Sequence, residues 1–135
     1  MKRMRRLRVN EAVRGMVRET RLDKRDLIYP MFVTEGENLV NPVESMPGIC
    51  QYSIDRMDEE LARVLAAGVT AVLIYGIPAH KDETGSEAYN DNGVTQRAIR
   101  HIKAAYPELL VIADICLCEY TSHGHCGLVC GEEIL

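Results

Sequence analysis

The stretch Val69-Thr70-Ala71-Val72-Leu73-Ile74-Tyr75 is apolar at almost every position. An apolar run of this kind is typical of a strand that is buried on both faces of a parallel sheet. Two similar runs occupy residues 27–33 and 109–114. The first contains Pro30, which argues against a central strand because proline has no N–H to donate to a neighbour. The three runs predict three strands of one sheet.

Amphipathic helices are predicted between these strands. One helix runs from about residue 53 or 55 to 67 and ends at Gly68, and a second runs from about 93 to 106 and ends before Pro107. A loop rich in Gly, Pro and Asn is expected at 36–48. The apolar positions recur at helical spacing in both helices: Met57, Leu61, Val64 and Leu65 in the first, and Val94, Ala98, Ile102 and Ala105 in the second.

The order strand, helix, strand, helix, strand indicates βαβ units with right-handed crossovers, and therefore an α/β fold. Three strands are too few for a closed barrel or a comfortable open sheet, and a (β/α)₈ barrel needs about 250 residues. The chain has 135 residues. We therefore expect an incomplete domain.

Charge divides the chain into a basic arm and an acidic remainder. Residues 1–25 contain ten Lys or Arg and three Asp or Glu, a balance of +7, and residues 26–135 contain six and seventeen, a balance of −11. The arm has no interleaved aromatic residues, so we expect it to dock on an acidic surface of its own or a neighbouring subunit rather than on nucleic acid. Neither a membrane span nor a signal peptide is visible, and a cytoplasmic location is expected.

Clustered cysteines indicate a metal site. Four of the five cysteines lie within fifteen residues, whereas a disulfide framework normally spaces its cysteines along the chain. The cluster comprises Cys116, Cys118, Cys126 and Cys130, with His123 and His125 among them.

The spacing of the cluster suggests how the ligands converge. If the third strand continues through Cys118, then Asp114, Cys116 and Cys118 point to one face of the sheet. The glycine-containing loop that follows can return Cys126 as a third ligand. Thiolate-rich tetrahedral coordination is what zinc prefers.

The number of ligands decides what such a zinc does. Three protein ligands leave a fourth position open for substrate, whereas a fourth ligand, from Cys130, His123 or His125, closes the site and makes it structural. Spacing alone slightly favours the structural site. The cysteine cluster follows the carboxyl end of a predicted strand, where parallel α/β folds place their active sites, and this favours a catalytic zinc. Both alternatives stay open on these grounds.

The string from Asp114 to Gly127, Asp-x-Cys-x-Cys-x-Tyr-Thr-x-His-Gly-His-Cys-Gly, closely resembles that of the zinc-dependent porphobilinogen synthases, or 5-aminolevulinate dehydratases. The resemblance covers essentially the whole chain. It includes residues 3–8, 26–30, 45–48, 75–78 and 81–86.

The resemblance implies the N-terminal part of a TIM (β/α)₈ barrel: a basic arm at 1–25, then about three βα units at 26–135 that end in the cysteine-rich zinc loop. It implies a lyase that condenses two molecules of 5-aminolevulinate into porphobilinogen with loss of two waters, in haem and other tetrapyrrole biosynthesis. The family's arm wraps a neighbouring subunit, usually in a homo-octamer. Any magnesium that members use is expected outside this chain.

The resemblance also assigns residues. It implies Cys116, Cys118 and Cys126 as the zinc ligands, with the open fourth position facing substrate, and Asp114 as an active-site acid. His125 matches a position proposed to touch a second, more weakly held zinc in some members. Independently of the resemblance, Tyr120 and Thr121 are expected to support the metal loop, for example through a hydrogen bond to a thiolate.

One feature departs from the family. Its Schiff-base lysines lie on later barrel strands, and none of the lysines of this chain matches a catalytic position. We expect these lysines to be exposed and the chain to be inactive alone. The lysines are Lys2, Lys24, Lys81 and Lys103.

Two alternatives come from other classes of site and protein. The polar loop at 76–92 could supply oxygen ligands for magnesium, but its spacing does not match a calcium loop and a solvated loop is favoured. The chain could also be a small non-catalytic structural zinc module, which needs Cys130 as the fourth ligand. The oxygen ligands of the first alternative are Asp82, Glu83, Asp91 and Asn92.

Overall fold

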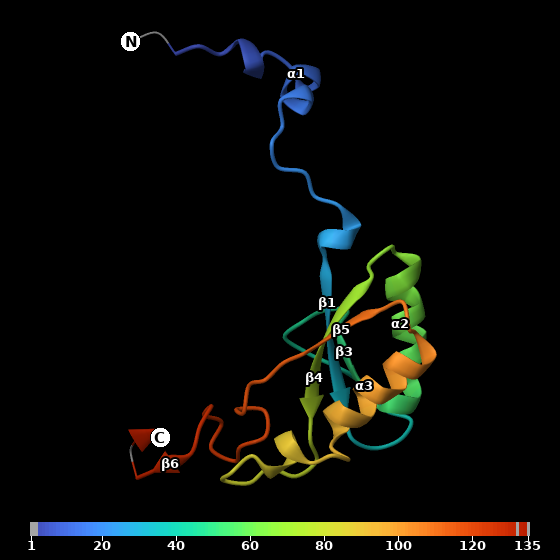
Figure 1. Ribbon diagram of the computed structural model, residues 1–135, viewed down its shortest axis with the longest axis vertical. Helices are drawn as coiled ribbons and strands as arrows, with labels where there is room; N and C mark the ends of the chain where they lie inside the picture. Colours follow the sequence, from blue (N-terminus) through green and yellow to red (C-terminus); the bar gives the residue numbers. More distant parts are fainter. Residues whose placement is uncertain (1–2, 132, 135) are drawn as a thin grey trace.

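The computed structural model describes residues 3–131 and 133–134, and its centre is a five-stranded sheet in the order β2-β3-β1-β4-β5 (Figure 1). β1, β3, β4 and β5 are parallel, and β2 pairs antiparallel with β3. The three predicted strands are confirmed as β1, β4 and β5. The strands are β1 (Ile28–Thr34), β2 (Val40–Pro42), β3 (Cys50–Tyr52), β4 (Ala71–Ile77) and β5 (Leu110–Ala113).

The helices α2 (Met57–Ala66) and α3 (Val94–Ala105) lie on the same side of this sheet (Figure 1). Their predicted apolar stripes are confirmed, except that Leu65 is only partly buried and Ala105, in the last turn of α3, is exposed. Gly68 has φ +87° and ends α2 as predicted. The core comprises Met57, Leu61, Val64, Val94, Ala98 and Ile102 from the helices and Met31, Val33, Val72 and Ile74 from the sheet.

The sheet corrects the sequence analysis in one respect and explains it in another. The loop predicted at 36–48 contains β2, which is too short to show a periodic pattern. Pro30 lies within β1, and it is tolerated because β1 pairs along its whole length with β4 but with β3 only at Phe32 and Val33. Beside Pro30 the strand therefore has one partner, and proline is confined to such edge positions.

The predicted burial of the third strand is wrong for this chain. Leu110 in β5 is 60% exposed, and the strand shows no buried residue in its four positions. In the described part of the chain β5 pairs with β4 alone, so it forms an edge of the sheet. A strand becomes buried on both faces only when further elements cover it.

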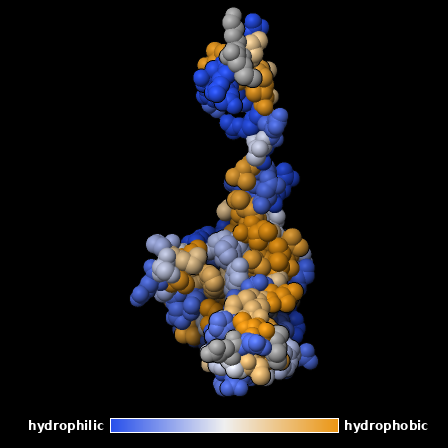
Figure 2. All heavy atoms as spheres, turned by 90° about the vertical axis from the view of Figure 1, so that its left-hand side faces the viewer, coloured by the Kyte–Doolittle hydropathy of each residue, from blue (hydrophilic) through white to orange (hydrophobic). Residues whose placement is uncertain are grey.

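The N-terminal arm extends away from the sheet (Figure 1), and nearly all of its described residues are exposed. It contains the 3₁₀ turns Arg6–Arg8 and Lys24–Asp26 and the short helix α1 (Glu11–Met16). Its surface mixes basic and hydrophobic side chains (Figure 2), and Met4, Met16 and Leu22 are each at least 80% exposed. Residues 1 and 2, and with them the expectation for Lys2, lie outside the described residues.

At the other end of the described chain, β6 (Val129–Cys130) and β7 (Glu133–Ile134) form a separate two-stranded sheet. Among the described residues, no helix has the length and apolar character needed to cross a membrane.

A buried carboxylate ties the sheet to α2. Glu60 is 4% exposed and accepts hydrogen bonds from the hydroxyls of Tyr29 in β1 (2.6 Å) and Tyr52 in β3 (3.2 Å). Arg63 completes the group with an ion pair of 2.8 Å. Burial, together with the hydrogen bond to Glu60, raises the pKa of Tyr29 to about 12, and burial also raises the pKa of Tyr52.

This arrangement predicts a late alkaline titration for Tyr29. Because its folded-state pKa lies above the ordinary tyrosine pKa of about 10, its contribution to stability is complete below pH 10 and is lost as the pH rises toward about 12. Tyrosinate absorbance of the folded chain should therefore lose a late component in Tyr29→Phe. Tyr89→Phe, at a tyrosine that is 70% exposed, is the matched control for the loss of one tyrosine and should leave the Tyr29 component in place. A late component of unchanged size in Tyr29→Phe would contradict the prediction.

Candidate metal centre

The cysteine loop, residues 114–128, leaves the sheet at the end where the carboxyl ends of β1 and β4 point (Figure 1). The expectation that the strand continues through Cys118 is wrong. The Asp114 N–H donates to the carbonyl of Ile74 (3.2 Å), and the chain then turns, with the N–H groups of Tyr120 and Thr121 both donating to the carbonyl of Leu117 (2.9 and 3.0 Å). In a strand, the neighbouring side chains of Tyr120 and Thr121 would point to opposite faces. The turn allows both to be buried, Tyr120 at 4% and Thr121 at 2% exposure.

The turn nevertheless brings cysteines together. The Sγ atoms of Cys116 and Cys118 lie 2.6 Å apart, and all five cysteines are free thiols. The Sγ of Cys126 accepts a hydrogen bond from the N–H of Leu117 (3.2 Å), which places this sulfur against the residue between the other two. Zn–S bonds of about 2.3 Å hold the sulfurs of a tetrahedral site about 3.8 Å apart. The sulfurs of Cys116 and Cys118 must therefore move apart by about 1 Å to share an ion.

The other candidate ligands are placed differently. Cys130 lies exposed in β6, and no hydrogen bond among the described residues joins it to the other cysteines. The rings of His123 and His125 stack with their centroids 5.7 Å apart, and Nε2 of His123 lies 3.2 Å from the carbonyl oxygen of Glu83. Across residues 3–131 and 133–134, no three His, Cys, Asp or Glu side chains are gathered closely enough to hold a metal ion. The thiol groups and their place after β5 therefore fit a thiolate metal site. The sulfurs of Cys116 and Cys118 are adjacent, but the described residues do not gather three ligands around one point.

Acidic groups lie beside the cysteines. Burial raises the pKa of Glu119 to about 7, the negative charge of Asp114 adds to this rise, and Lys81 opposes it. The Oε2 atom of Glu119 is buried without a hydrogen-bond partner among the described residues. Close to neutral pH this carboxyl group is therefore present in both protonation states, next to the predicted active-site acid.

A buried hydrogen bond anchors the cysteine loop to α3. The hydroxyl groups of Tyr120 and Thr95 lie 2.6 Å apart, and Thr95, in the first turn of α3, is 6% exposed. Both pack over Gly76 in β4, where an added Cβ would lie 1.9 Å from Oγ1 of Thr95. Thr121 adds a second anchor within the loop, because its hydroxyl donates to the carbonyl of His125 (2.9 Å).

The sequence analysis assigned no role to Thr95 or Gly76, and it began the following loop at Gly76 although β4 continues to Ile77. A signal for Gly76 exists in the sequence. A glycine within an otherwise apolar strand often marks a close approach of another chain segment. No comparable signal marks Thr95, whose partner is twenty-five residues away.

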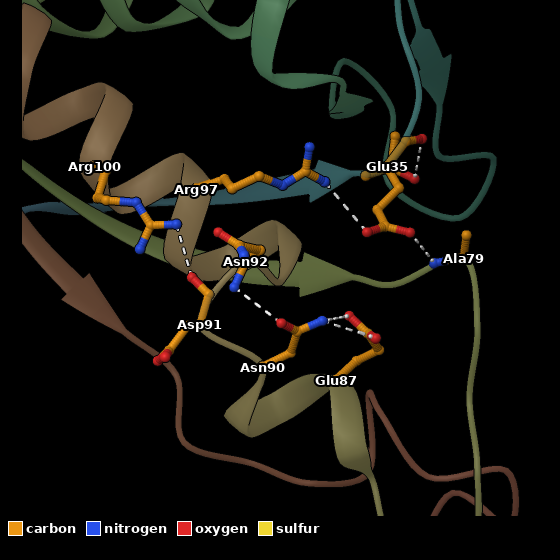
Figure 3. A network of polar contacts seen from close by, with 9 residues as sticks. Glu35, Ala79, Glu87, Asn90, Asp91, Asn92, Arg97 and Arg100 are labelled. Atoms are coloured by element: carbon orange, nitrogen blue, oxygen red, sulfur yellow. Dashed lines mark hydrogen bonds and ion pairs between the residues drawn. The ribbon is translucent and has the colours of Figure 1, made fainter.

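The β4–α3 loop, residues 78–92, is itself held in place from two sides (Figure 3). The carboxylate of Glu35, just after β1, accepts from the N–H of Ala79 (3.0 Å) and from Arg97 in α3 (3.2 Å). Arg100 donates to the carbonyl of Asp91 (2.7 Å) at the other end of the loop. These contacts join the ends of β1 and β4 to α3.

Lys24, Lys81 and Lys103 are exposed as predicted, in a 3₁₀ turn, the β4–α3 loop and α3. The alternative oxygen-ligand site of this loop does not gather three acidic side chains around one point in the part of the chain that the structure describes. The carboxylate of Asp82 is instead engaged by Thr84 and Ser86.

Known proteins resemble this chain along its whole length. The family model described as delta-aminolevulinic acid dehydratase matches residues 1–135. The delta-aminolevulinic acid dehydratase of Ruminiclostridium josui is 53% identical over 134 residues, which cover 99% of this chain and 65% of that protein. The corresponding protein of Halalkalibacterium halodurans is 51% identical over 99% of this chain and 41% of its own length.

The fold is shared as well. The crystal structure of the Toxoplasma gondii delta-aminolevulinic acid dehydratase (porphobilinogen synthase) in complex with the reaction product porphobilinogen superposes with a TM-score of 0.91 and 34% identity. The match covers 100% of this chain and 39% of that one, which confirms the predicted fold class, the N-terminal part of a (β/α)₈ barrel. The chain therefore belongs to the delta-aminolevulinic acid dehydratase family.

Proposed function

We propose that this chain carries the metal-binding part of a porphobilinogen synthase, a lyase that condenses two molecules of 5-aminolevulinate into porphobilinogen with loss of two waters. The observation that carries the proposal is the family match along all 135 residues. The product-bound relative supports the same reaction. In this proposal residues 1–25 are an assembly arm and residues 26–135 are the first βα units of the barrel.

The metal in this proposal is zinc, held by Cys116, Cys118 and Cys126. Two observations support this set: the contact between the first two sulfurs, and the N–H of Leu117 that donates to the third. An N–H donor stabilises the thiolate form that zinc requires. When bound, zinc supplies a Lewis acid for a substrate carbonyl. Asp114 and Glu119 add carboxyl groups beside it that can hold or release a proton of a substrate amine or water.

We propose further that the protein assembles as a homo-octamer in the cytoplasm, with the arm seated on a neighbouring subunit. The exposed hydrophobic side chains of the arm support this proposal, since they cover nothing in a single chain. Its charge of +7 against an acidic remainder provides the complementary electrostatics.

The reaction itself provides the test. The 135-residue chain alone, supplied with 5-aminolevulinate, is expected to form no porphobilinogen, because its exposed lysines are not placed to form the Schiff bases. Co-expression with the remaining C-terminal part of the Halalkalibacterium halodurans relative is expected to restore product. The Cys118→Ser variant of this chain should abolish that restored activity.

Two results would contradict the proposal. The first is product from the chain alone at a rate near that of an intact relative. The second is borohydride trapping of substrate on Lys81 or Lys103, checked with Lys→Arg variants at each position.

A further inference from the structure

We infer that Asp82 is a positioning residue for the cysteine loop: its carboxylate fixes the shape of residues 82–86, and this segment supports the turn between the proposed zinc ligands. The inference rests on the zinc site proposed above. Asp82 precedes the nearest of these ligands by more than thirty residues and is not itself offered as a ligand.

The carboxylate of Asp82 organises its own loop. One oxygen accepts from the N–H and hydroxyl of Thr84 (3.0 and 3.1 Å) and from the N–H of Ser86 (3.0 Å), and the other accepts from the hydroxyl of Ser86. These donors hold the pKa of Asp82 well below its usual range, and the hydrogen bond from the Ser86 hydroxyl has the largest effect. The group therefore stays ionised, and its four donors fold residues 82–86 into one defined turn.

The backbone of this turn then supports the cysteine loop. The carbonyl of Asp82 accepts from the N–H of Ser122 (2.8 Å), and Asp82 and Thr121 form a parallel β-bridge. The next carbonyl, that of Glu83, lies 3.2 Å from Nε2 of His123. Three consecutive residues of the cysteine loop thus contact two consecutive residues of the 82–86 turn.

Close packing reinforces these hydrogen bonds. Gly85 has φ +64° and is buried against the cysteine loop. A Cβ at this position would lie 3.3 Å from Cγ2 of Thr121, 3.5 Å from Cβ of Tyr120 and 3.8 Å from Cδ2 of Leu117. A side chain at position 85 would therefore come into contact with Leu117, the residue that separates Cys116 from Cys118, so the turn lies close beside it.

Leu117 connects the turn at 82–86 to the sulfurs of the cysteine loop. The carbonyl of Leu117 accepts from Tyr120 and Thr121, and its N–H donates to Sγ of Cys126. Apart from a single bridge, no strand or helix lies between Asp114 and Leu128 to stiffen the segment. Its geometry must then come from neighbouring parts of the chain. Loss of the Asp82 carboxylate should free Thr121 and Ser122 to move, and with them all three sulfurs.

The test uses Co²⁺ as the probe, because thiolate-bound cobalt has a charge-transfer absorption that reports both affinity and geometry. The full chain is compared with Asp82→Asn, which keeps one acceptor oxygen, and with Asp82→Ala, which keeps none. Glu83→Gln is the matched control. It removes one negative charge from the adjacent exposed residue and leaves the carbonyl contact to His123 in place.

We expect about 10- to 100-fold weaker Co²⁺ binding in Asp82→Ala, the range found when groups that orient metal ligands are removed. Asp82→Asn should fall between this variant and the unaltered chain, and the band per bound ion should change shape in both. Glu83→Gln should bind like the unaltered chain. Circular dichroism and thermal unfolding check that the sheet is intact. If Asp82→Ala does not fold, Ser86→Ala, which removes a single donor, is expected to show the same change to a smaller degree.

Unaltered affinity and spectrum in folded Asp82→Ala, or in Ser86→Ala where it replaces that variant, would overturn the inference while leaving the zinc site standing. Equal weakening in Glu83→Gln would also overturn it, since charge alone would then explain the effect. The zinc proposal fails differently: the unaltered chain would show no thiolate band, or Cys118→Ser would keep it.

Discussion

Cys118→Ser is expected to reduce the bound zinc from one ion per chain to almost none, whereas Cys130→Ser is expected to retain it. The sulfur of Cys118 touches that of Cys116, so its loss removes one of two adjacent donors. Cys130 lies exposed in β6, apart from the proposed ligands. A serine hydroxyl is a poor substitute because it loses its proton far less readily than a thiol.

Acidity provides a second measure of the same site. A thiol must lose its proton before it binds, so each bound cysteine makes zinc affinity fall as the pH is lowered. The unaltered chain should therefore lose zinc progressively in acid, and Cys130→Ser should follow the same curve. Metal content after dialysis at a series of pH values measures both effects. Equal loss of zinc in Cys130→Ser and Cys118→Ser at neutral pH would instead support the closed site of a structural zinc module.

The sequence predicted the main elements of the fold because their patterns are local. The apolar run at 69–75 identifies β4, and the spacing of Met57, Leu61 and Val64 identifies the buried face of α2. β2 and β3, with three residues each, are too short to carry such a pattern. Their place in the sheet depends on pairing with β1 and with each other, which no window of sequence contains.

The predicted site divides in the same way. The cysteine spacing indicates the candidate ligands and their chemical type, and the resemblance selects three of them, but neither predicts the path of the chain between them. Alternation from Asp114 through Cys118 is compatible with a strand, but the chain turns instead, and Tyr120 and Thr121 become buried with hydrogen bonds to Thr95 and to the carbonyl of His125. The supporting residues were missed for a related reason. Asp82 and Thr95 act on segments twenty-five or more residues away, and contacts over such distances have no signature in a single sequence.

Gly76→Ala is expected to destabilise the folded chain by about 2 to 5 kcal/mol. The added Cβ would lie 1.9 Å from Oγ1 of Thr95 and 3.0 Å from the hydroxyl oxygen of Tyr120. Thr95 is branched at Cβ and sits in the first turn of α3, so it has few other rotamers available. Moving it also breaks its hydrogen bond and leaves the Tyr120 hydroxyl buried without that partner. Overpacking and the lost hydrogen bond therefore both contribute to the expected loss of stability.

A second substitution separates this cause from a general intolerance of side chains in β4. Thr95→Ala alone should destabilise by about 1 to 3 kcal/mol, because the hydroxyl of Tyr120 loses its partner. In that background the closest obstacle to the new Cβ is gone, so Gly76→Ala should cost at least about 1 kcal/mol less than in the unaltered chain. Urea unfolding of the four proteins measures the coupling. Strictly additive losses would mean that Thr95 and its hydrogen bond to Tyr120 do not limit the space over Gly76.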